Sequence, residues 1–395
     1  MRVVPITQAN TLESHAGAWA ALLERSAANR PTRAPFWLLA WWQVFGSVGG
    51  RKMASALFYE GDRLVGVAPL LRRVAWYRRA VPFRRLELLA TGESEADEIV
   101  SDYLGVIAER GHEQPVAQAL AAEIRRGTLG PCDEVVLSAL DGDDPMVPAL
   151  AGALGDQQMV VEQSAATPSP YIKLPATWEA YLAALSGSGR YLVNRSLRDF
   201  DKWAKGEVEV ARVKTPADLE QGKRILVMLH EQRWKSSGEA GVFASQLFTR
   251  FHDAVLPALL ERNALDLCWL NVRGQPIAVA YNLIWDNKVL FYQGGRTLEV
   301  PKAVRPGIVL HARSIRAAIE AGRSEYDFLA GMSQYKLQLS TARRPMLQLR
   351  AARAPVRDVA RLAIELGAAA WRARRAAPAE TKRPEAASGG DPAAS

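Results

Sequence analysis

One stretch of the sequence, residues 285–336, constrains the fold of this chain more than any other. Near its start, Val289–Tyr292 is a short apolar run with an aromatic end, which is typical of a β-strand. Gln293–Arg296 carries two glycines and is expected to end that strand. A polar loop follows and closes on Arg305–Pro306–Gly307, so the sequence predicts a turn before the next element.

A helix and a second strand are predicted directly after this turn. Apolar residues recur at helical spacing from Ile308 to Ile319, and Gly322 stands where a helix C-cap glycine belongs. Tyr326–Leu329 is the next strand-like run. Strand, loop, helix and strand in this order normally form a parallel crossover. The free N–H groups and the positive dipole at the start of such a helix, next to Gly307, suit a phosphate or pyrophosphate.

Length and composition indicate a globular chain with two domains. The chain has 395 residues, of which 49% are hydrophobic and 23% charged. It contains no apolar run near twenty residues and no signal-peptide pattern, so neither a transmembrane helix nor a leader is expected. Cys132 and Cys268 are expected to be buried thiols in a reducing, cytoplasmic compartment, and no Cys/His spacing suggests a metal site. The net charge of +8 favours anionic partners such as CoA, nucleotides, tRNA or lipid headgroups.

Two hairpin patterns indicate that the chain repeats one α/β unit. Ala54–Tyr59 and Leu64–Leu71 flank one turn, and Leu267–Val272 and Pro276–Ile284 flank the other. Pro69 interrupts its strand and is expected at an edge or a bulge. Each hairpin follows a helical segment with aromatic residues, which favours an internal duplication, although chance similarity of two hairpins is the alternative.

The fold class predicted from this pattern is α/β, with two tandem units that have mixed sheets flanked by helices. Residues 1–163 form the first half and residues 165–350 the second, with the polar stretch Gln163–Pro170 as the boundary. Residues 351–375 are expected to form a C-terminal helix. Residues 376–395 are rich in Ala, Pro, Glu, Ser and Gly and are expected to be disordered.

Several basic segments have both a binding and a structural interpretation. Arginine pairs interleaved with aromatics between Arg72 and Arg85 suggest a polyanion surface or, preferably, an exposed loop. Arg195 and Arg198 are neighbours on one helical face and either grip an anion or pair with local aspartates. The amphipathic C-terminal helix contacts a membrane surface or tRNA, or docks on the domain with its charges in water, which is the default. His230 is expected to be structural, with a role as base near the acceptor as the alternative, and His311 is expected to face solvent, with a phosphate contact as the alternative.

The stretch that opened this section resembles the second domain of GNAT-like acyltransferases of the BioF-like/CelD type, relatives of the FemAB peptidoglycan aminoacyl transferases. The residues that carry the resemblance are Phe291–Gly295, Arg305–Gly307, Gly322, Tyr326–Phe328 and Tyr335–Lys336. In the GNAT superfamily a turn of this kind cradles the pyrophosphate of acyl-CoA. Here Arg305–Pro306–Gly307 replaces the usual glycine-rich form. The resemblance implies an N-acyltransferase that uses acyl-CoA as co-substrate.

The site residues are predicted from this resemblance and from what direct attack of an amine on a thioester requires. The reaction needs a bound carrier, donors for the oxyanion and an acceptor for the amine proton. The carrier is expected to bind Gln293, Arg305, Gly307 and Ile308, with backbone N–H groups near Gln293 receiving the oxyanion. The predicted catalytic residues are Asp327 as proton acceptor, Lys336 as its partner, and Tyr335. A purely structural Asp327–Lys336 ion pair is the alternative. The remaining predicted substrate-binding residues are Arg195, Arg198, Trp234, Tyr292 and Arg296.

Two other functional classes stay open. One is a FemAB-like transferase that takes its amino acid from aminoacyl-tRNA, and the other is a non-catalytic accessory protein of exopolysaccharide synthesis. The expected acceptor is a small-molecule, glycan-linked or lipid-linked amine, in keeping with a role in cell-envelope or exopolysaccharide biosynthesis. DNA is not expected as a partner, whereas peripheral membrane contact is compatible with the basic helices.

Overall fold

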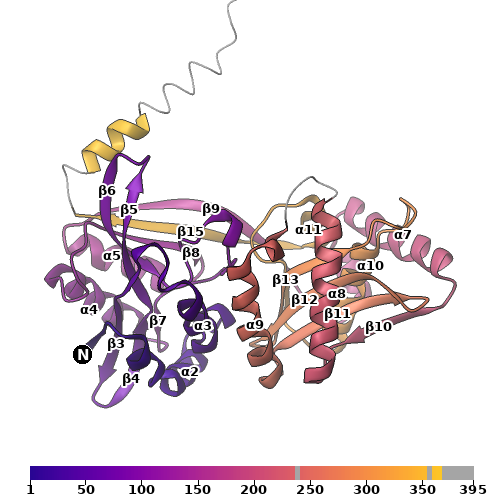
Figure 1. Ribbon diagram of the computed structural model, residues 1–395, viewed down its shortest axis with the longest axis horizontal. Helices are drawn as coiled ribbons and strands as arrows, with labels where there is room; N and C mark the ends of the chain where they lie inside the picture. The colour runs from indigo at the N-terminus through magenta and orange to yellow at the C-terminus, as the bar shows by residue number, and fades with distance from the viewer. Residues whose placement is uncertain (236–240, 354–357, 367–395) are drawn as a thin grey trace, which may run out of the picture.

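The computed structural model describes residues 1–235, 241–353 and 358–366 (Figure 1). The helices are α1 (Ala9–Glu13), α2 (Ala16–Arg25), α3 (Pro35–Phe45), α4 (Glu113–Arg126), α5 (Met146–Asp156), α6 (Trp178–Ala184), α7 (Gly187–Ala204), α8 (Pro216–Lys235), α9 (Gln246–Glu261), α10 (Pro306–Glu320) and α11 (Gln334–Leu339). Residues 358–366 add a helical segment. No helix in these ranges is both long enough and apolar enough to span a bilayer.

The strands are β1 (Arg2–Ile6), β2 (Lys52–Met53), β3 (Ser55–Glu60), β4 (Arg63–Ala68), β5 (Leu70–Tyr77), β6 (Val81–Leu88), β7 (Ile107–Ala108), β8 (Glu134–Asp141), β9 (Val160–Lys173), β10 (Val208–Arg212), β11 (Leu265–Val272), β12 (Gln275–Trp285), β13 (Lys288–Arg296), β14 (Glu325–Asp327) and β15 (Ala342–Ala352). They form a four-stranded sheet in the order β1-β3-β4-β7 and an eleven-stranded sheet in the order β10-β11-β12-β13-β14-β9-β15-β8-β6-β5-β2. The long strands β9 and β15 run from the first half of the molecule into the second (Figure 1).

The predicted duplication is confirmed by the order of elements in the two halves. In the first half, β1 is followed by three helices and the hairpin β3–β4, and in the second half β10 is followed by α8, α9 and the hairpin β11–β12. The strands β1-β3-β4 and β10-β11-β12 are adjacent and antiparallel in the same order. The helices α3 and α9 pack against each other, with the rings of Trp37 and Phe251 in an edge-to-face contact at 5.0 Å. The chain therefore has the predicted α/β class, with two similar units.

Pro69 marks the point where the chain passes from the small sheet to the large one. The strand β4 ends at Ala68, and β5 begins at Leu70 and pairs with β6. This confirms the expected interruption, because proline has no N–H to donate to a ladder. The basic segment between Arg72 and Arg85 was expected to be a loop, but it forms the hairpin β5–β6. There Arg73 binds Glu87 and Arg84 binds Asp133.

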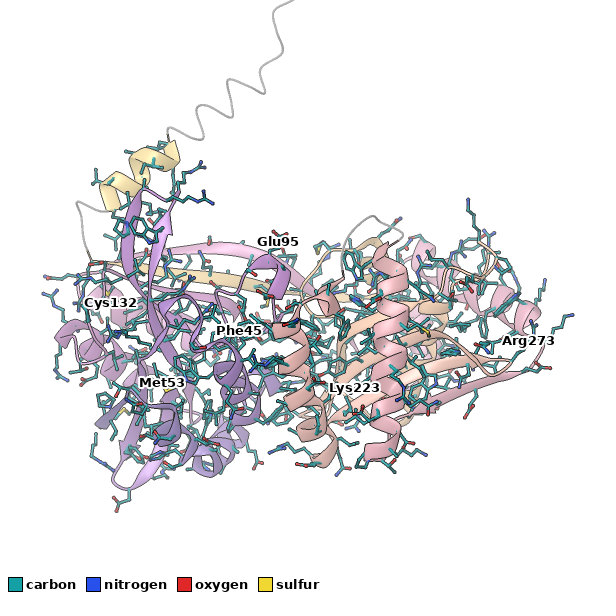
Figure 2. The ribbon with its side chains drawn as sticks, viewed as in Figure 1. Phe45, Met53, Glu95, Cys132, Lys223 and Arg273 are labelled. Carbon is teal, nitrogen blue, oxygen red and sulfur yellow. The ribbon has the colours of Figure 1, made fainter. Side chains whose placement is uncertain are left out.

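Buried apolar side chains form two cores, one on each face of the second-half sheet. Figure 2 shows the side chains on the ribbon. One core fills the first half and continues past α3 and α9 to the α8 face of that sheet. The other lies beneath α7 and α10. Cys132 and Cys268 are both free and buried, as expected. Because the first core contains residues of both halves, the two halves pack directly against each other.

The polar stretch Gln163–Pro170, which was predicted as the boundary between the halves, is part of a strand. It lies inside β9, where Val160–Pro170 pairs with β15 and Tyr171–Lys173 pairs with β14. This stretch is held in a ladder by β15, a strand that is remote in the chain, which sequence pattern alone does not reveal. The division into residues 1–163 and 165–350 stays a prediction, and residues 376–395 lie outside the described residues.

Candidate active site

The strand β13 pairs with its neighbour β14 over only part of its length, at the centre of the second half. Only Lys288–Leu290 of β13 pairs with β14, in the predicted parallel sense. The strand does not end at Gln293 as expected but runs on to Arg296, paired with β12. The register shifts beside Tyr292, which is an extra residue in the ladder and therefore a β-bulge. Past Leu290, the β14 side of β13 is thus open to a ligand, within the part of the chain that the structure describes.

The N-terminus of α10 faces this opening. Arg305 is the N-cap residue, its side chain makes no capping hydrogen bond, and Pro306 occupies the first helical position. The first intrahelical bond is from Val309 N–H to the Arg305 carbonyl, so the N–H groups of Gly307 and Ile308 have no acceptor within the helix. The helix ends at Glu320, shortly before Gly322 with φ of 65°, as predicted. The positive end of a 15-residue helix is therefore presented to the opening.

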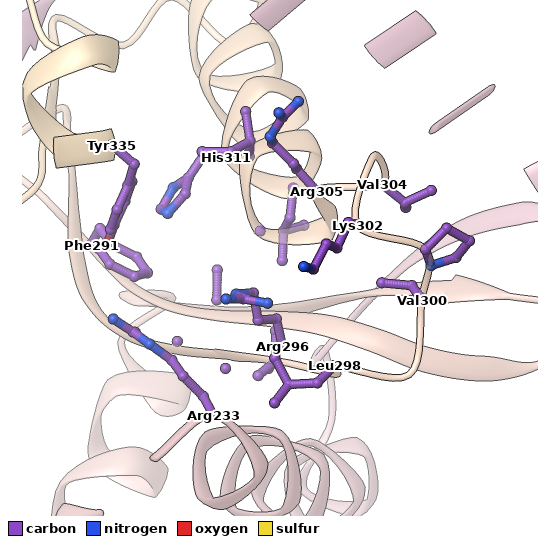
Figure 3. Close-up of a pocket in the computed structure, with 18 residues that line it drawn as sticks. Arg233, Phe291, Arg296, Leu298, Val300, Lys302, Val304, Arg305, His311 and Tyr335 are labelled. Atoms are coloured by element: carbon purple, nitrogen blue, oxygen red, sulfur yellow. The ribbon is translucent and has the colours of Figure 1, made fainter. Parts of the chain in front are cut away.

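A pocket of about 630 Å³ lies between β13 and α10 (Figure 3). It is lined by Arg233, Val279, Ala280, Phe291, Gly294, Gly295, Arg296, Leu298, Val300, Pro301, Lys302, Val304, Arg305, Gly307, Ile308, Leu310, His311 and Tyr335. Four of these described residues are basic, and none is acidic. The pocket therefore attracts anions strongly and is otherwise apolar.

The basic residues come from three separate segments and line the same pocket, where the Arg305 side chain points away from Arg296 and Lys302 (Figure 3). Arg233 belongs to α8, Arg296 ends β13, and Lys302 and Arg305 belong to the loop that leads into α10. In Figure 3, Arg296 and Lys302 point toward each other across the cavity. Partial burial and the charge of Arg233 lower the pKa of Arg296. Nη1 of Arg305 is buried and has no hydrogen-bond partner among the described residues. Like charges held together in this way favour a ligand with more than one negative charge.

The other end of the pocket is aromatic. The His311 ring packs edge-to-face on Phe291 at 4.5 Å and stacks on Tyr335 at 5.4 Å. Its Nδ1 lies 3.1 Å from the hydroxyl of Tyr326, which leaves Nε2 for a ligand. Burial lowers the pKa of His311 to about 3, and the charges of Lys336 and Arg233 act in the same direction. The imidazole is therefore neutral at physiological pH. Burial raises the pKa of Tyr335, so its phenol stays protonated.

Asp327 and Lys336 do not form the ion pair that the sequence suggested. Asp327 is fully buried and binds Nη1 of Arg344 through Oδ2 at 2.8 Å. The same oxygen accepts a hydrogen bond from Tyr103, and Oδ1 accepts one from the N–H of Leu329. Lys336 donates instead to the carbonyl oxygens of Phe328 and Ala330, at 2.7 and 3.0 Å, and burial lowers its pKa to about 8. The prediction missed Arg344 because it follows Asp327 by 17 residues on another strand.

The remaining predicted residues divide between the pocket and other places. Arg296, Arg305, Gly307, Ile308 and Tyr335 line the pocket, as described above. Tyr292 is buried in the core between Trp37 and Tyr281. Trp234 donates from Nε1 to Nε2 of His230 at 2.9 Å, and Gln293 also interacts with His230. Arg195 and Arg198 both lie beside Asp199 on the surface of α7, which is their structural interpretation.

Three pocket residues with basic or imidazole side chains were not among the predicted site residues: Arg233, Lys302 and His311. The signal for His311 was present, because it follows Gly307 by four residues and so lies on the same face of α10. Arg233 and Lys302 have no such signal, since α8 and the loop reach the pocket only through the tertiary fold.

Comparisons with known proteins agree with the fold described above. Residues 187–337 match the family described as the acetyltransferase (GNAT) domain. The solved structures similar to this chain include FemX, with a TM-score of 0.57, 10% identity, and coverage of 87% of this chain and 97% of that one. A conserved protein of unknown function from Bacteroides thetaiotaomicron has a TM-score of 0.52 and 11% identity, over 89% and 100% of the two chains. At these identities the structures show a shared fold alone. No curated protein matches the sequence.

Proposed function

We propose that this protein is an N-acyltransferase that transfers an acyl group from acyl-CoA to an amine, since residues 187–337 match the family described as the acetyltransferase (GNAT) domain. The observation that carries the proposal is the pocket itself. It places an uncapped helix N-terminus and four basic residues around one cavity with no acidic residue in its described lining. A pyrophosphate needs this combination of backbone donors and positive charge.

The carrier would be held by the residues at the start of α10. The N–H groups of Gly307 and Ile308 have no acceptor within the helix, and Nη1 of Arg305 is buried without a partner. These groups are suited to phosphate oxygens, since a guanidinium and a helix N-terminus both bind anions through directed N–H groups. The aliphatic residues Leu298 and Val304 lie near them in the lining and would contact the less polar part of the carrier.

The reaction would occur at the aromatic end of the pocket, without a covalent enzyme intermediate. The amine nitrogen forms a bond to the thioester carbonyl carbon, the oxyanion collapses, the C–S bond breaks, and a proton passes from the amine to the departing thiolate. The open side of β13 at its bulge can offer N–H groups to the oxyanion. Neutral His311 can hydrogen-bond the reacting amine through Nε2, and protonated Tyr335 can donate to the thiolate. Asp327 is not among the lining residues, so we propose a structural role for it.

A second candidate function is aminoacyl transfer of the FemAB kind. The observation in its favour is that the FemX fold covers 87% of this chain, including the first half. Transfer assays that offer acetyl-CoA and an aminoacyl-tRNA in parallel, with a mixture of amines as acceptors, separate the two donors. An accessory role without catalysis would be supported if neither donor is consumed while variants of the pocket still support polysaccharide synthesis.

The proposed carrier site predicts that Arg305→Ala weakens acyl-CoA binding by roughly ten- to a hundred-fold, because a charge-assisted contact to phosphate is lost. Isothermal titration calorimetry with acetyl-CoA measures the affinity. Arg316→Ala is the matched control, since Arg316 lies on the same helix, is exposed, and pairs with Glu320. It should bind as the native protein does. Equal affinities of the two variants would remove Arg305 from the site.

A further inference from the structure

The helical segment 358–366 is oriented with its apolar side outward. Val359, Leu362 and Leu366 are spaced to form one stripe, and 63%, 41% and 68% of their respective surfaces are exposed. The charged residues Asp358 and Arg361 are buried on the opposite side. This is the reverse of the expected arrangement, in which the helix docks by its apolar side and leaves its arginines in water.

Ion pairs with the strands β9 and β15 fix this reversed orientation. Nε of Arg361 lies 2.8 Å from Asp358, and its Nη2 lies 2.9 Å from Glu162 on β9. Arg350 on β15 also binds Asp358, at 2.5 Å. The Arg361 guanidinium lies over the ring of Tyr77 on β5, at 5.8 Å. Rotating the helix to bury its apolar stripe would break the contacts with Glu162, Arg350 and Tyr77 and leave Arg350 with one carboxylate fewer, which is costly. The stripe is therefore not available to the core of its own chain.

The neighbouring hairpin β5–β6 adds exposed apolar and basic residues. Val74 and Trp76 lie on the face of β5 opposite to Tyr77, so they flank the hairpin on the side away from the helical segment, with 50% and 60% of their surfaces exposed. The hairpin turn carries Arg78 and Arg79, both exposed and both in the left-handed region, with φ of 48° and 59°. Figure 1 shows the hairpin and the yellow helical segment projecting together beyond the sheets of the first half. We call residues 70–88 together with residues 358–366 the projecting arm.

We propose that the projecting arm docks this protein on the surface of an anionic lipid bilayer. Aliphatic and tryptophan side chains enter the headgroup boundary, while arginines bind lipid phosphates, so the arm carries both kinds of residue that interfacial binding requires. A twofold contact with a second copy fits less well. In such a contact the same surface of both copies meets, so Arg78 and Arg79 of one copy approach the same arginines of the other, and their like charges repel. The inference does not depend on the proposed activity, although a lipid-linked acceptor would be reached from such a surface.

Co-sedimentation of the full-length protein with lipid vesicles tests the proposal. We expect the protein to bind vesicles of phosphatidylcholine mixed with phosphatidylglycerol and to bind phosphatidylcholine vesicles far less. Leu362→Ser combined with Leu366→Ser, and separately Arg78→Glu combined with Arg79→Glu, should each reduce binding by about tenfold or more. Val48→Ser is the control, because Val48 is a similarly exposed apolar residue outside the arm. The melting temperatures should stay close to the native value, since the substituted side chains are exposed.

Three outcomes would overturn the proposal. The first is that the native protein fails to sediment with the anionic vesicles. The second is that both arm variants sediment with these vesicles to the same extent as the native protein. The third is that sedimentation velocity shows a native dimer that Leu362→Ser with Leu366→Ser dissociates, without any vesicle binding. This last result would assign the stripe to a second copy of the chain instead of a membrane.

Discussion

Arg344→Met is expected to lower the free energy of unfolding by about 3–5 kcal/mol, because it removes a guanidinium that pairs with three buried carboxylates. Arg344 binds Asp327 at 2.8 Å and Glu325 at 2.8 Å, and its Nε lies 3.7 Å from Asp141. All three carboxylates are buried. Methionine fills a similar volume but leaves their charges without this partner. Since Arg344 joins β15 to β14 and β8, the loss should weaken the contact between the two halves of the molecule.

Chemical denaturation followed by circular dichroism measures this effect. Arg343→Met is the matched control, because Arg343 is the exposed neighbour on the same strand and its loss should change stability by no more than about 0.5 kcal/mol. The loss of stability in Asp327→Asn should lie between the losses in these two variants. The amide still accepts a hydrogen bond, and Arg344 keeps its ion pair with Glu325. Equal stabilities of Arg344→Met and Arg343→Met would show that the ionic network contributes nothing.

The second large effect is expected at His311, where substitution by leucine should reduce kcat by roughly 10²–10³-fold. Leucine keeps the apolar packing against Phe291 and Tyr335 but removes Nε2, which we place against the reacting amine. The KM for acyl-CoA should change little, because the carrier is held at the other end of the pocket. Steady-state kinetics with acetyl-CoA and an accepted amine give both constants.

The control for His311 is another buried histidine. His252→Leu removes an imidazole that is equally buried, and burial lowers its pKa to about 3 as well, but His252 is not part of the pocket lining. It should retain kcat. A pH profile adds a second check, since a His311 pKa of about 3 means that its imidazole gives no inflection between pH 5 and pH 9. Full activity of His311→Leu in a stable protein would remove His311 from the chemistry.

The parts of the fold that could be predicted are those set by nearby residues. Both hairpins follow from alternating apolar residues around short turns, and Pro69 was correctly expected to interrupt its strand. The crossover from β13 to β14 was also correct, because the periodicity from Ile308 to Ile319 and the glycine at 322 define α10 locally. Arg305, Gly307 and Ile308 were placed at the pocket for the same reason: they belong to one turn.

The parts that could not be predicted depend on contacts between distant segments. Gln163–Pro170 is polar and contains prolines, which is typical of a linker, but pairing with β15 makes it a strand. Asp327 has a cation nine residues away in Lys336, yet its partner is Arg344 on β15. The reversed helix at 358–366 is the clearest case, because its amphipathic pattern was read correctly while its orientation is set by Glu162 and Arg350.

The central claim is that an anionic carrier binds at the N-terminus of α10, and titration of the Gly307→Asp variant with acetyl-CoA tests it most directly. Space is available, since a β-carbon at Gly307 would meet its nearest neighbour, Cδ of Arg296, at 3.6 Å. An aspartate in the first turn stabilises a helix by about 0.3–1 kcal/mol, so the variant should melt no lower than the native protein. The same carboxylate repels a phosphate. We predict that calorimetry shows acetyl-CoA binding to the native protein and at least about tenfold weaker binding to Gly307→Asp. Equal affinity in both, or no binding to the native protein, would contradict the account.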